Sequence, residues 1–169
     1  MKRLASLLIF LSIVLNLSAQ NNTKEDSRIN KKILYGQITL DAFEMDLCSP
    51  WYAPEHDSYL ADTIILKKLR EQNLTDISIS LIIGSWCHDS HREVPRFIKI
   101  LEEINYSFDR LQMNALDTDK TSPNFDAKAN NVTNVPTVII YRNGEEIGRI
   151  IESPKKSLEK DLLKIISKN

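Results

Sequence analysis

The residues best suited to chemistry in this chain are Cys-His-Asp-Ser at positions 87–90. They lie between an apolar segment, 77–83, typical of a buried strand and a segment, 91–104, whose apolar residues recur at helical spacing. A cysteine at such a junction has its sulfur near the N-terminus of the helix. Unpaired N–H groups and the positive end of the helix dipole there favour the thiolate, the nucleophile of disulfide chemistry.

Ser90 stands where a Cys-x-x-Cys motif would have its second thiol. Cys87 is therefore expected to act without a partner in the motif. Ser90, one helical turn on, is expected to donate a hydrogen bond to the thiolate, although a simple small-residue replacement is the alternative.

The other cysteine of the chain is Cys48. A disulfide would require the two Cα atoms to lie within about 7 Å. We expect instead that Cys48 is a mostly buried free thiol distant from Cys87. A structural disulfide and a resolving role for Cys48 are the alternatives.

The histidines near the cysteine admit two interpretations. His88 and Asp89 are expected to tune the thiolate in opposite senses. Cys87 and His91 lie four positions apart, a spacing that could hold copper or zinc on one helical face. Two ligands are too few for a metal site, so the sequence predicts neither a metal nor a cofactor.

The first twenty residues have the features of a secretory signal. Lys2 and Arg3 precede an almost unbroken apolar stretch from Leu4 to Leu17, and small residues follow before Gln20. The stretch is shorter than the roughly 20 residues that span a bilayer, so cleavage is favoured over an uncleaved anchor. We expect a secreted or periplasmic protein without stable membrane insertion after cleavage.

The remaining length and charge limit the class of partner. About 150 residues would remain, enough for one domain. Loss of the two basic residues changes the net charge from −1 to −3, and acidic and basic residues are interspersed. This pattern excludes the basic footprint of a nucleic-acid-binding protein.

The N-terminal third of the mature chain is irregular. We expect a polar, flexible leader over 21–32 within an extension that reaches residue 59. Apolar residues in 33–40 could form a strand or an extended arm, and 50–54 resembles a packed turn rich in aromatic residues. Asp62 predicts the start of a helix that ends near Gln72.

The rest, 60–169, alternates strands and helices. Strands are expected over 76–83, 110–116, 137–141 and 146–151, and Asn143-Gly144 predicts a hairpin between the last two. Ser153 and Pro154 are expected to cap and begin the final helix. The order predicts an α/β domain with a mixed sheet.

This region resembles the thioredoxin superfamily. Three motifs carry the resemblance: Trp86-Cys87, Pro95 in the following helix, and 135–137, Val-Pro-Thr, before an apolar strand. Segments 84–90 and 92–97 are also similar to an exported bacterial branch with Trp-Cys-x-Asp-Ser.

The resemblance implies a central mixed β-sheet flanked by helices on both faces. It also implies a cis bond before Pro136, lying against Cys87. Two departures stand out: Ser90 replaces the resolving cysteine, and Leu81 replaces a buried aspartate that assists proton transfer.

Together these features predict a thiol–disulfide exchange protein, oxidoreductase- or isomerase-like, that forms mixed disulfides through its single active-site thiol. The candidate catalytic residues are Cys87, Ser90 and Pro136, and the candidate binding residues are Trp86, His88 and Val135. The expected partners are a cysteine-containing protein or a small thiol, with an external thiol as reductant. The alternatives are a non-catalytic thioredoxin-fold binding module and a Cys/His metal-binding protein.

Overall fold

The computed structural model describes residues 21–167. The predicted signal segment, 1–20, lies outside the described residues. The elements follow in the order β1 (Thr23–Asp26), β2 (Lys31–Leu34), β3 (Gly36–Ile38), a 3₁₀ helix (Leu40–Glu44), α1 (Ser49–Ser58), α2 (Thr63–Arg70), β4 (Ile77–Ile83), α3 (His88–Glu103), a 3₁₀ helix (Phe108–Arg110), β5 (Leu111–Ala115), β6 (Thr137–Arg142), β7 (Glu145–Ile151) and α4 (Leu158–Ile166). Within 21–167, no helix combines the length and the apolar character needed to cross a membrane.

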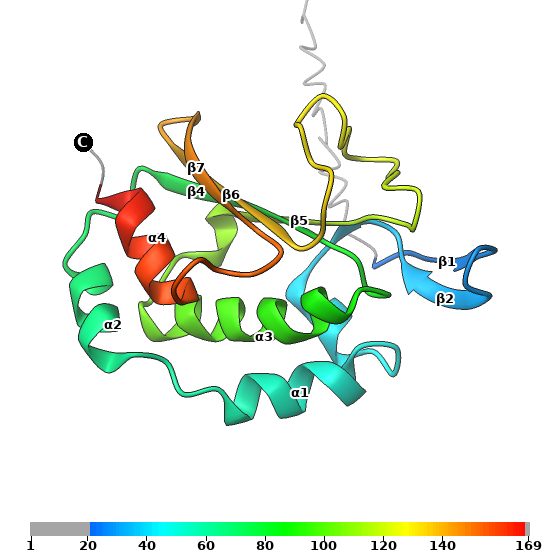
Figure 1. The fold of residues 1–169 in the computed structure, drawn as a ribbon, viewed down its shortest axis with the longest axis horizontal. Coiled ribbons are helices and arrows are strands. Elements are labelled where there is room, and N and C mark those ends of the chain that lie inside the picture. Colours follow the sequence, from blue (N-terminus) through cyan, green and yellow to red (C-terminus); the bar gives the residue numbers. More distant parts are fainter. Residues whose placement is uncertain (1–20, 168–169) are drawn as a thin grey trace, which may run out of the picture.

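A five-stranded mixed sheet forms the centre of the molecule (Figure 1). Its strand order is β3-β5-β4-β6-β7, with β4 parallel to β5 and the other pairs antiparallel. The central strand, β4, is apolar at five of its seven positions, and its residues from Ile79 to Ile83 are all buried. A strand covered on both faces is expected to be mostly apolar.

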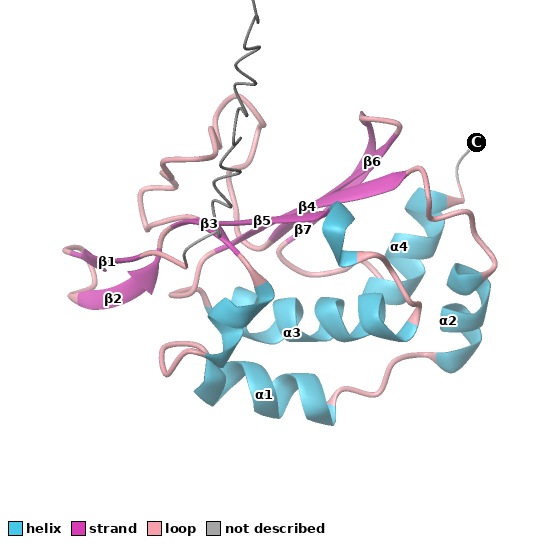
Figure 2. Ribbon diagram, turned by 180° about the vertical axis from the view of Figure 1, so that it is seen from behind, coloured by secondary structure: helices cyan, strands magenta, loops and turns pink. Residues whose placement is uncertain are grey.

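The helices pack on one face of this sheet. Figures 1 and 2 show α3 and α4 directly beneath the strands, with α1 lying outside α3 and α2 beside α4. Side chains of β4 and α3, such as Leu81 and Phe97, belong to the same large core. The predicted α/β fold, a central mixed sheet flanked by helices, is confirmed.

The second face of the sheet is covered differently from our expectation of helices on both faces. The connection 116–136, which contains turns but no helix, packs Ala127 and Val132 against Ile82 and Ile139 of the sheet. Nine of the 21 residues in this connection are Asn, Asp or Pro, which favour turns over helices.

The expected flexible leader is wrong for the start of the described chain. Residues 23–34 form an antiparallel hairpin of β1 and β2. The Nζ of Lys24 lies 2.7 Å from Asp117, and the carboxylate of Asp26 accepts hydrogen bonds from Thr118. These contacts with residues far away in the chain order a segment whose polar composition alone predicted flexibility.

Two local predictions are also wrong. The expected turn at 50–54 is part of helix α1, in which Pro50 occupies the first turn and packing against α3 compensates for Pro54 in the interior. The last helix begins at Leu158, because the hydroxyl of Ser157 accepts from the N–H of Lys160. The predicted cap of α2 is confirmed: Asp62 accepts from the first backbone N–H groups.

Candidate functional site

Cys87 is the N-cap residue of α3. Its sulfur donates to the backbone oxygen of Val135 at 3.2 Å, and its side chain is half-buried. The N–H of Cys87 donates to Gly84 at 2.9 Å, which closes the turn between β4 and the helix. The thiol is thus held between a helix N-terminus and the loop before β6.

The peptide bond between Val135 and Pro136 is cis. The oxygen of Pro136 accepts from the N–H of Glu152 at 2.7 Å, which fixes this loop to the end of β7. The structure therefore brings together three predicted site residues, Cys87, Val135 and Pro136.

Ser90 lies behind the thiol and is fully buried. Its hydroxyl oxygen accepts from the N–H of Gly84 at 3.2 Å. Within 21–167, no hydrogen bond joins this hydroxyl to the sulfur of Cys87, so Ser90 braces the active-site turn in this structure.

Trp86 packs beside the thiol on the second face of the sheet. Its indole N–H donates to the oxygen of Leu116 at 2.9 Å, and the Nζ of Lys120 lies 4.2 Å from the ring centre. The ring leaves no space at Gly84, where an added Cβ would lie 2.9 Å from the indole and 3.0 Å from Val135. Close packing therefore requires glycine at this position.

His88, the remaining predicted binding residue, is exposed at the start of α3. Its neighbour Asp89 pairs with Arg92 at 2.8 Å, and Arg92 also donates to the hydroxyl of Ser153. The side chain of His88 is free to meet a partner but takes no part in holding the thiol.

His91 has a role that the sequence did not indicate. Its Nε2 donates to the oxygen of Ser85 at 2.7 Å, and its ring stacks on Trp51 of α1 with centroids 4.4 Å apart. The hydroxyl of Ser85 accepts from the N–H of Leu34 at 2.9 Å. The N-terminal extension thus supports the turn before Cys87 at two points, through Trp51 and through Leu34.

These contacts also bear on metal binding. The hydrogen bond to Ser85 occupies Nε2 of His91, one of the two ligands that the sequence offered. Among the described residues, no group of three or more His, Cys, Asp or Glu side chains is placed to hold a metal ion.

Cys48 is a fully buried free thiol, as predicted. It belongs to the core on the helical face of the sheet, whereas Cys87 packs against the smaller cluster on the other face. Burial raises the pKa of the Cys48 thiol to about 12, so the protonated form dominates at neutral pH.

A buried carboxylate also lies near the site, even though Leu81 occupies the position where the resemblance implied a buried aspartate. Glu93, which is 6% exposed, lines a cavity of about 10 Å³ together with Leu81 and Pro136. Such a cavity has room for about one water molecule. Arg92 donates to the carboxylate of Glu93 at 2.7 Å.

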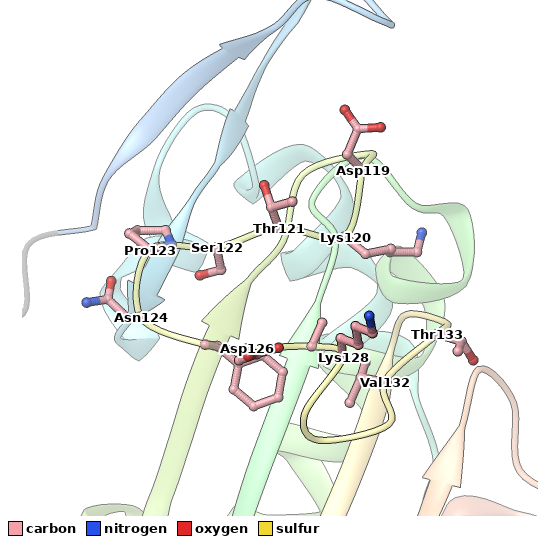
Figure 3. Close-up of a pocket in the computed structure, with 12 residues that line it drawn as sticks. Asp119, Lys120, Thr121, Ser122, Pro123, Asn124, Asp126, Lys128, Val132 and Thr133 are labelled. Atoms are coloured by element: carbon pink, nitrogen blue, oxygen red, sulfur yellow. The ribbon is translucent and has the colours of Figure 1, made fainter.

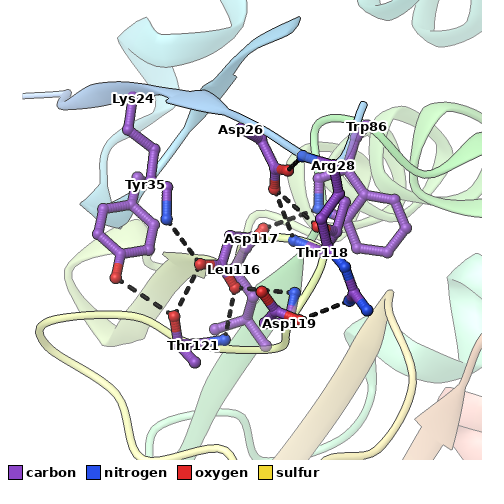
Figure 4. A network of polar contacts seen from close by, with 10 residues as sticks. All are labelled: Lys24, Asp26, Arg28, Tyr35, Trp86, Leu116, Asp117, Thr118, Asp119 and Thr121. Atoms are coloured by element: carbon purple, nitrogen blue, oxygen red, sulfur yellow. Dashed lines mark hydrogen bonds and ion pairs between the residues drawn. The ribbon is translucent and has the colours of Figure 1, made fainter. Parts of the chain in front are cut away.

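A polar network fixes the turn next to Trp86 (Figure 4). Asp117 accepts from Lys24 at 2.7 Å and from the N–H and hydroxyl groups of Thr121, while Asp26 accepts from Thr118. Burial opposes ionisation of Asp117, but the hydrogen bonds from Lys24 and Thr121 outweigh it and lower its pKa. Hydrogen bonds from Thr118 likewise lower the pKa of Asp26. We call these contacts the hairpin latch.

Neither a protein-family model nor any curated protein matches the sequence. Among solved structures, a protein of unknown function from Pseudomonas aeruginosa matches with a TM-score of 0.53 at 11% identity, over 75% of this chain and 76% of that one. The Schistosoma mansoni thioredoxin pre-protein matches at 25% identity over 60% and 89%, with a TM-score of 0.40. A Halobacterium salinarum thioredoxin mutant matches at 18% identity over 63% and 82%, with a TM-score of 0.37.

The likeness to the Pseudomonas protein is one of fold alone. The thioredoxin-like arrangement rests on the chain's own features. These are the strand order β5-β4-β6-β7, the cysteine at the N-terminus of α3, and the cis peptide bond beside it.

Proposed function

We propose that this chain is a thiol–disulfide exchange protein that forms mixed disulfides through Cys87 and has no resolving thiol in its motif. The observation that carries the proposal is the 3.2 Å contact between the Cys87 sulfur and Val135, at a helix N-terminus and beside Pro136. This position combines a sulfur at the N-cap of a helix with an adjoining loop, leading into β6, whose backbone a substrate can pair with.

The exchange step uses atoms already placed in the site. Cys87 loses its proton, and the thiolate attacks one sulfur of a substrate disulfide. A bond forms from Cys87 to that sulfur, and the other substrate sulfur leaves as a thiolate that takes up a proton. Cys87 is oxidised to a mixed disulfide while the leaving thiol is reduced.

Loss of the thiol proton also changes what Val135 can bind. In the thiol form, its oxygen accepts from the Cys87 sulfur; without the S–H, that oxygen is free to accept a substrate N–H. The neighbouring oxygen of Pro136 remains bonded to Glu152. We propose that an extended substrate pairs with the backbone at Val135, with the side chains of Trp86 and His88 on either side.

Release of the substrate requires a second thiol. Ser90 cannot supply one, and Cys48 is buried in the opposite core. We propose that an external thiol, or a second cysteine of the substrate, resolves the mixed disulfide in a secreted or periplasmic setting. Such chemistry suits isomerase-like exchange or substrate trapping better than efficient net reduction.

Trapping with mass detection tests this function. The folded protein, its Cys48→Ala variant and its Cys87→Ser variant are each treated with bis(2-hydroxyethyl) disulfide, and adducts are counted by intact mass. We expect one adduct on the wild type and on Cys48→Ala, and none on Cys87→Ser. An unreactive Cys87, or a cellular phenotype that Cys87→Ser leaves intact, would instead indicate a non-catalytic binding module.

A further inference from the structure

Arg92 joins the active-site helix, α3, to the segment that follows β7. Its Nη2 donates to Asp89 at 2.8 Å and to the hydroxyl of Ser153 at 2.8 Å, and its Nε donates to Glu93 at 2.7 Å. Among the described residues, the bond to Ser153 is the only side-chain hydrogen bond between α3 and that segment. The two carboxylates hold the guanidinium on its own helix, so that its remaining contact fixes the neighbouring segment.

Ser153 is tied in turn to the loop before β6. Its neighbour Glu152 donates its backbone N–H to the oxygen of Pro136 at 2.7 Å. Glu152 has a φ of 58°, in the left-handed region that few residues other than glycine adopt. Such a conformation persists where the surrounding contacts determine it. The hydrogen bonds of Ser153 and Glu152, one on each side, supply these contacts.

These contacts close a ring around the thiol. One side of the ring is α3, which carries Cys87 and Arg92, and the other is the loop that contains Val135 and Pro136. At one end, the oxygen of Val135 accepts from the Cys87 sulfur at 3.2 Å. At the other end, Ser153 accepts from Arg92. The separation between the thiol and the loop therefore depends on both contacts.

Packing between the two sides of this ring is incomplete. The cavity of about 10 Å³ lies between them, with Glu93 and Val94 of α3 on one side and Pro136 on the other. A close-packed interface would fix the separation of the two sides by itself. Because a space remains here, the hydrogen bond from Arg92 to Ser153 adds a restraint that the apolar contacts do not supply.

A larger cavity lies apart from the ring. It is open, has a volume of about 840 Å³ and is lined by segment 119–133 (Figure 3). Neither Cys87 nor any other residue of the ring lines it, and its two lysines are balanced by two aspartates. The ring, and not this cavity, contains the groups that a substrate of Cys87 meets.

We infer that Arg92 is a positioning residue for exchange: through Ser153, it holds the backbone at Val135 at the separation from Cys87 that an extended substrate requires. This inference rests on the proposed exchange function and gives it a preference for extended peptides. A peptide that pairs with Val135 while Cys87 attacks its sulfur uses both sides of the ring, whereas a small disulfide needs only the thiol. Loss of the contact therefore slows the reaction with a peptide more than the reaction with a small disulfide.

The test compares two disulfides that share a leaving group. One joins thionitrobenzoate to the cysteine of a short, uncharged, extended peptide, and the other joins it to mercaptoethanol. In both, the Cys87 thiolate bonds to the peptide or mercaptoethanol sulfur, and thionitrobenzoate leaves as a coloured thiolate. Its release gives the rate constant, and intact mass confirms the adduct on Cys87. The readout is the ratio of the peptide rate constant to the mercaptoethanol rate constant, in which any general change in the reactivity of the thiol cancels.

Ser153→Ala removes the acceptor and leaves Arg92 bonded to its own helix. We expect it to lower the ratio about tenfold, as for the loss of one hydrogen bond to a charged group. Arg92→Met should lower the ratio by a similar factor, and the double variant should lower it no further, because both changes break the same contact. Arg96→Met is the matched control: Arg96 lies one turn further along α3, donates to Glu55 of α1 at 2.6 Å and should leave the ratio unchanged.

The outcomes separate this inference from the exchange function. An unchanged ratio in Ser153→Ala, a further decrease in the double variant, or an equal decrease in Arg96→Met would overturn the role of Arg92 but leave exchange through Cys87 standing. Ser153→Ala keeps the partner of the buried Glu93, so it decides the question even if Arg92→Met does not fold. If the wild type releases thionitrobenzoate from neither reagent, the exchange function itself fails.

Discussion

The stack of Trp51 on His91 predicts that the N-terminal extension controls the reactivity of Cys87. Trp51→Ala removes a half-buried ring and its 4.4 Å contact with the histidine that holds Ser85. Truncation of a buried tryptophan costs about 3–5 kcal/mol, so we expect about 2 kcal/mol for this half-buried ring. Of this, the stack accounts for about 1 kcal/mol.

The effect on the thiol follows from the hydrogen bond that the stack supports. Loss of the stack is expected to weaken the His91–Ser85 hydrogen bond by about 1 kcal/mol. If all of this free energy appears in the activation barrier for modification of Cys87, the rate constant changes about fivefold. Urea unfolding gives the free energy of unfolding, and the iodoacetamide reaction of Cys87 in a Cys48→Ala background gives the rate.

Tyr52→Ala is the matched control. Tyr52 is the next residue of α1 and is also half-buried; it stacks on Phe43 and His56 and meets the Trp51 ring only edge-on, with centroids 6.1 Å apart. It should lower the free energy of unfolding by a similar amount without changing the rate at Cys87. Equal changes of rate in both variants, or no change in either, would refute a specific path from Trp51 through His91.

Three further predictions concern the thiols, the latch and the turn. Cys48 should resist alkylation at pH 8 in the folded protein and react in urea, because burial raises its pKa to about 12; reaction at the rate of Cys87 without urea would contradict this burial. The lowered pKa of Asp117 means that its contribution to stability is present above its ordinary value of 3.8 and is lost as the pH falls through the lower folded value. Asp117→Asn should therefore destabilise at pH 7, and this effect should shrink progressively as urea titrations are carried below pH 3.8, whereas an equal loss of stability at every pH would exclude a charge effect. Gly84→Ala should cost about 1–3 kcal/mol through its clash with Trp86, and an unchanged urea midpoint would show that the ring moves freely.

The parts of the fold that could be predicted have local signals. The apolar run of β4, the Asn143-Gly144 turn and the Asp62 cap each act within a few residues. The hairpin of 23–34 has no comparable signal. Its stability depends on Asp117 and Thr118, which are more than 90 positions away in the chain.

The site likewise has parts that local sequence signals predicted and parts that depend on contacts between distant segments. The positions of Cys87 and Pro136 followed from motifs at element boundaries, and the structure places them side by side through Val135. The support from Trp51 and Leu34 was not predictable, because a ring stack or a backbone donor between distant segments leaves no periodic trace in one sequence. The expected contact from Ser90 to the thiol is absent among the described residues; the Ser90 hydroxyl instead accepts a hydrogen bond from the N–H of Gly84.

The antiparallel pairing of β3 with β5 has a consequence for the order of folding. Gly36 pairs with Ala115, so the extension cannot dock until the chain has been made or released beyond that strand. Contacts of such long sequence separation form late and slow the folding of small domains. Until then, Ile33 and Leu34, both buried in the final structure, remain in contact with water. The β3 segment is thus buried late, although it precedes β5 in the chain.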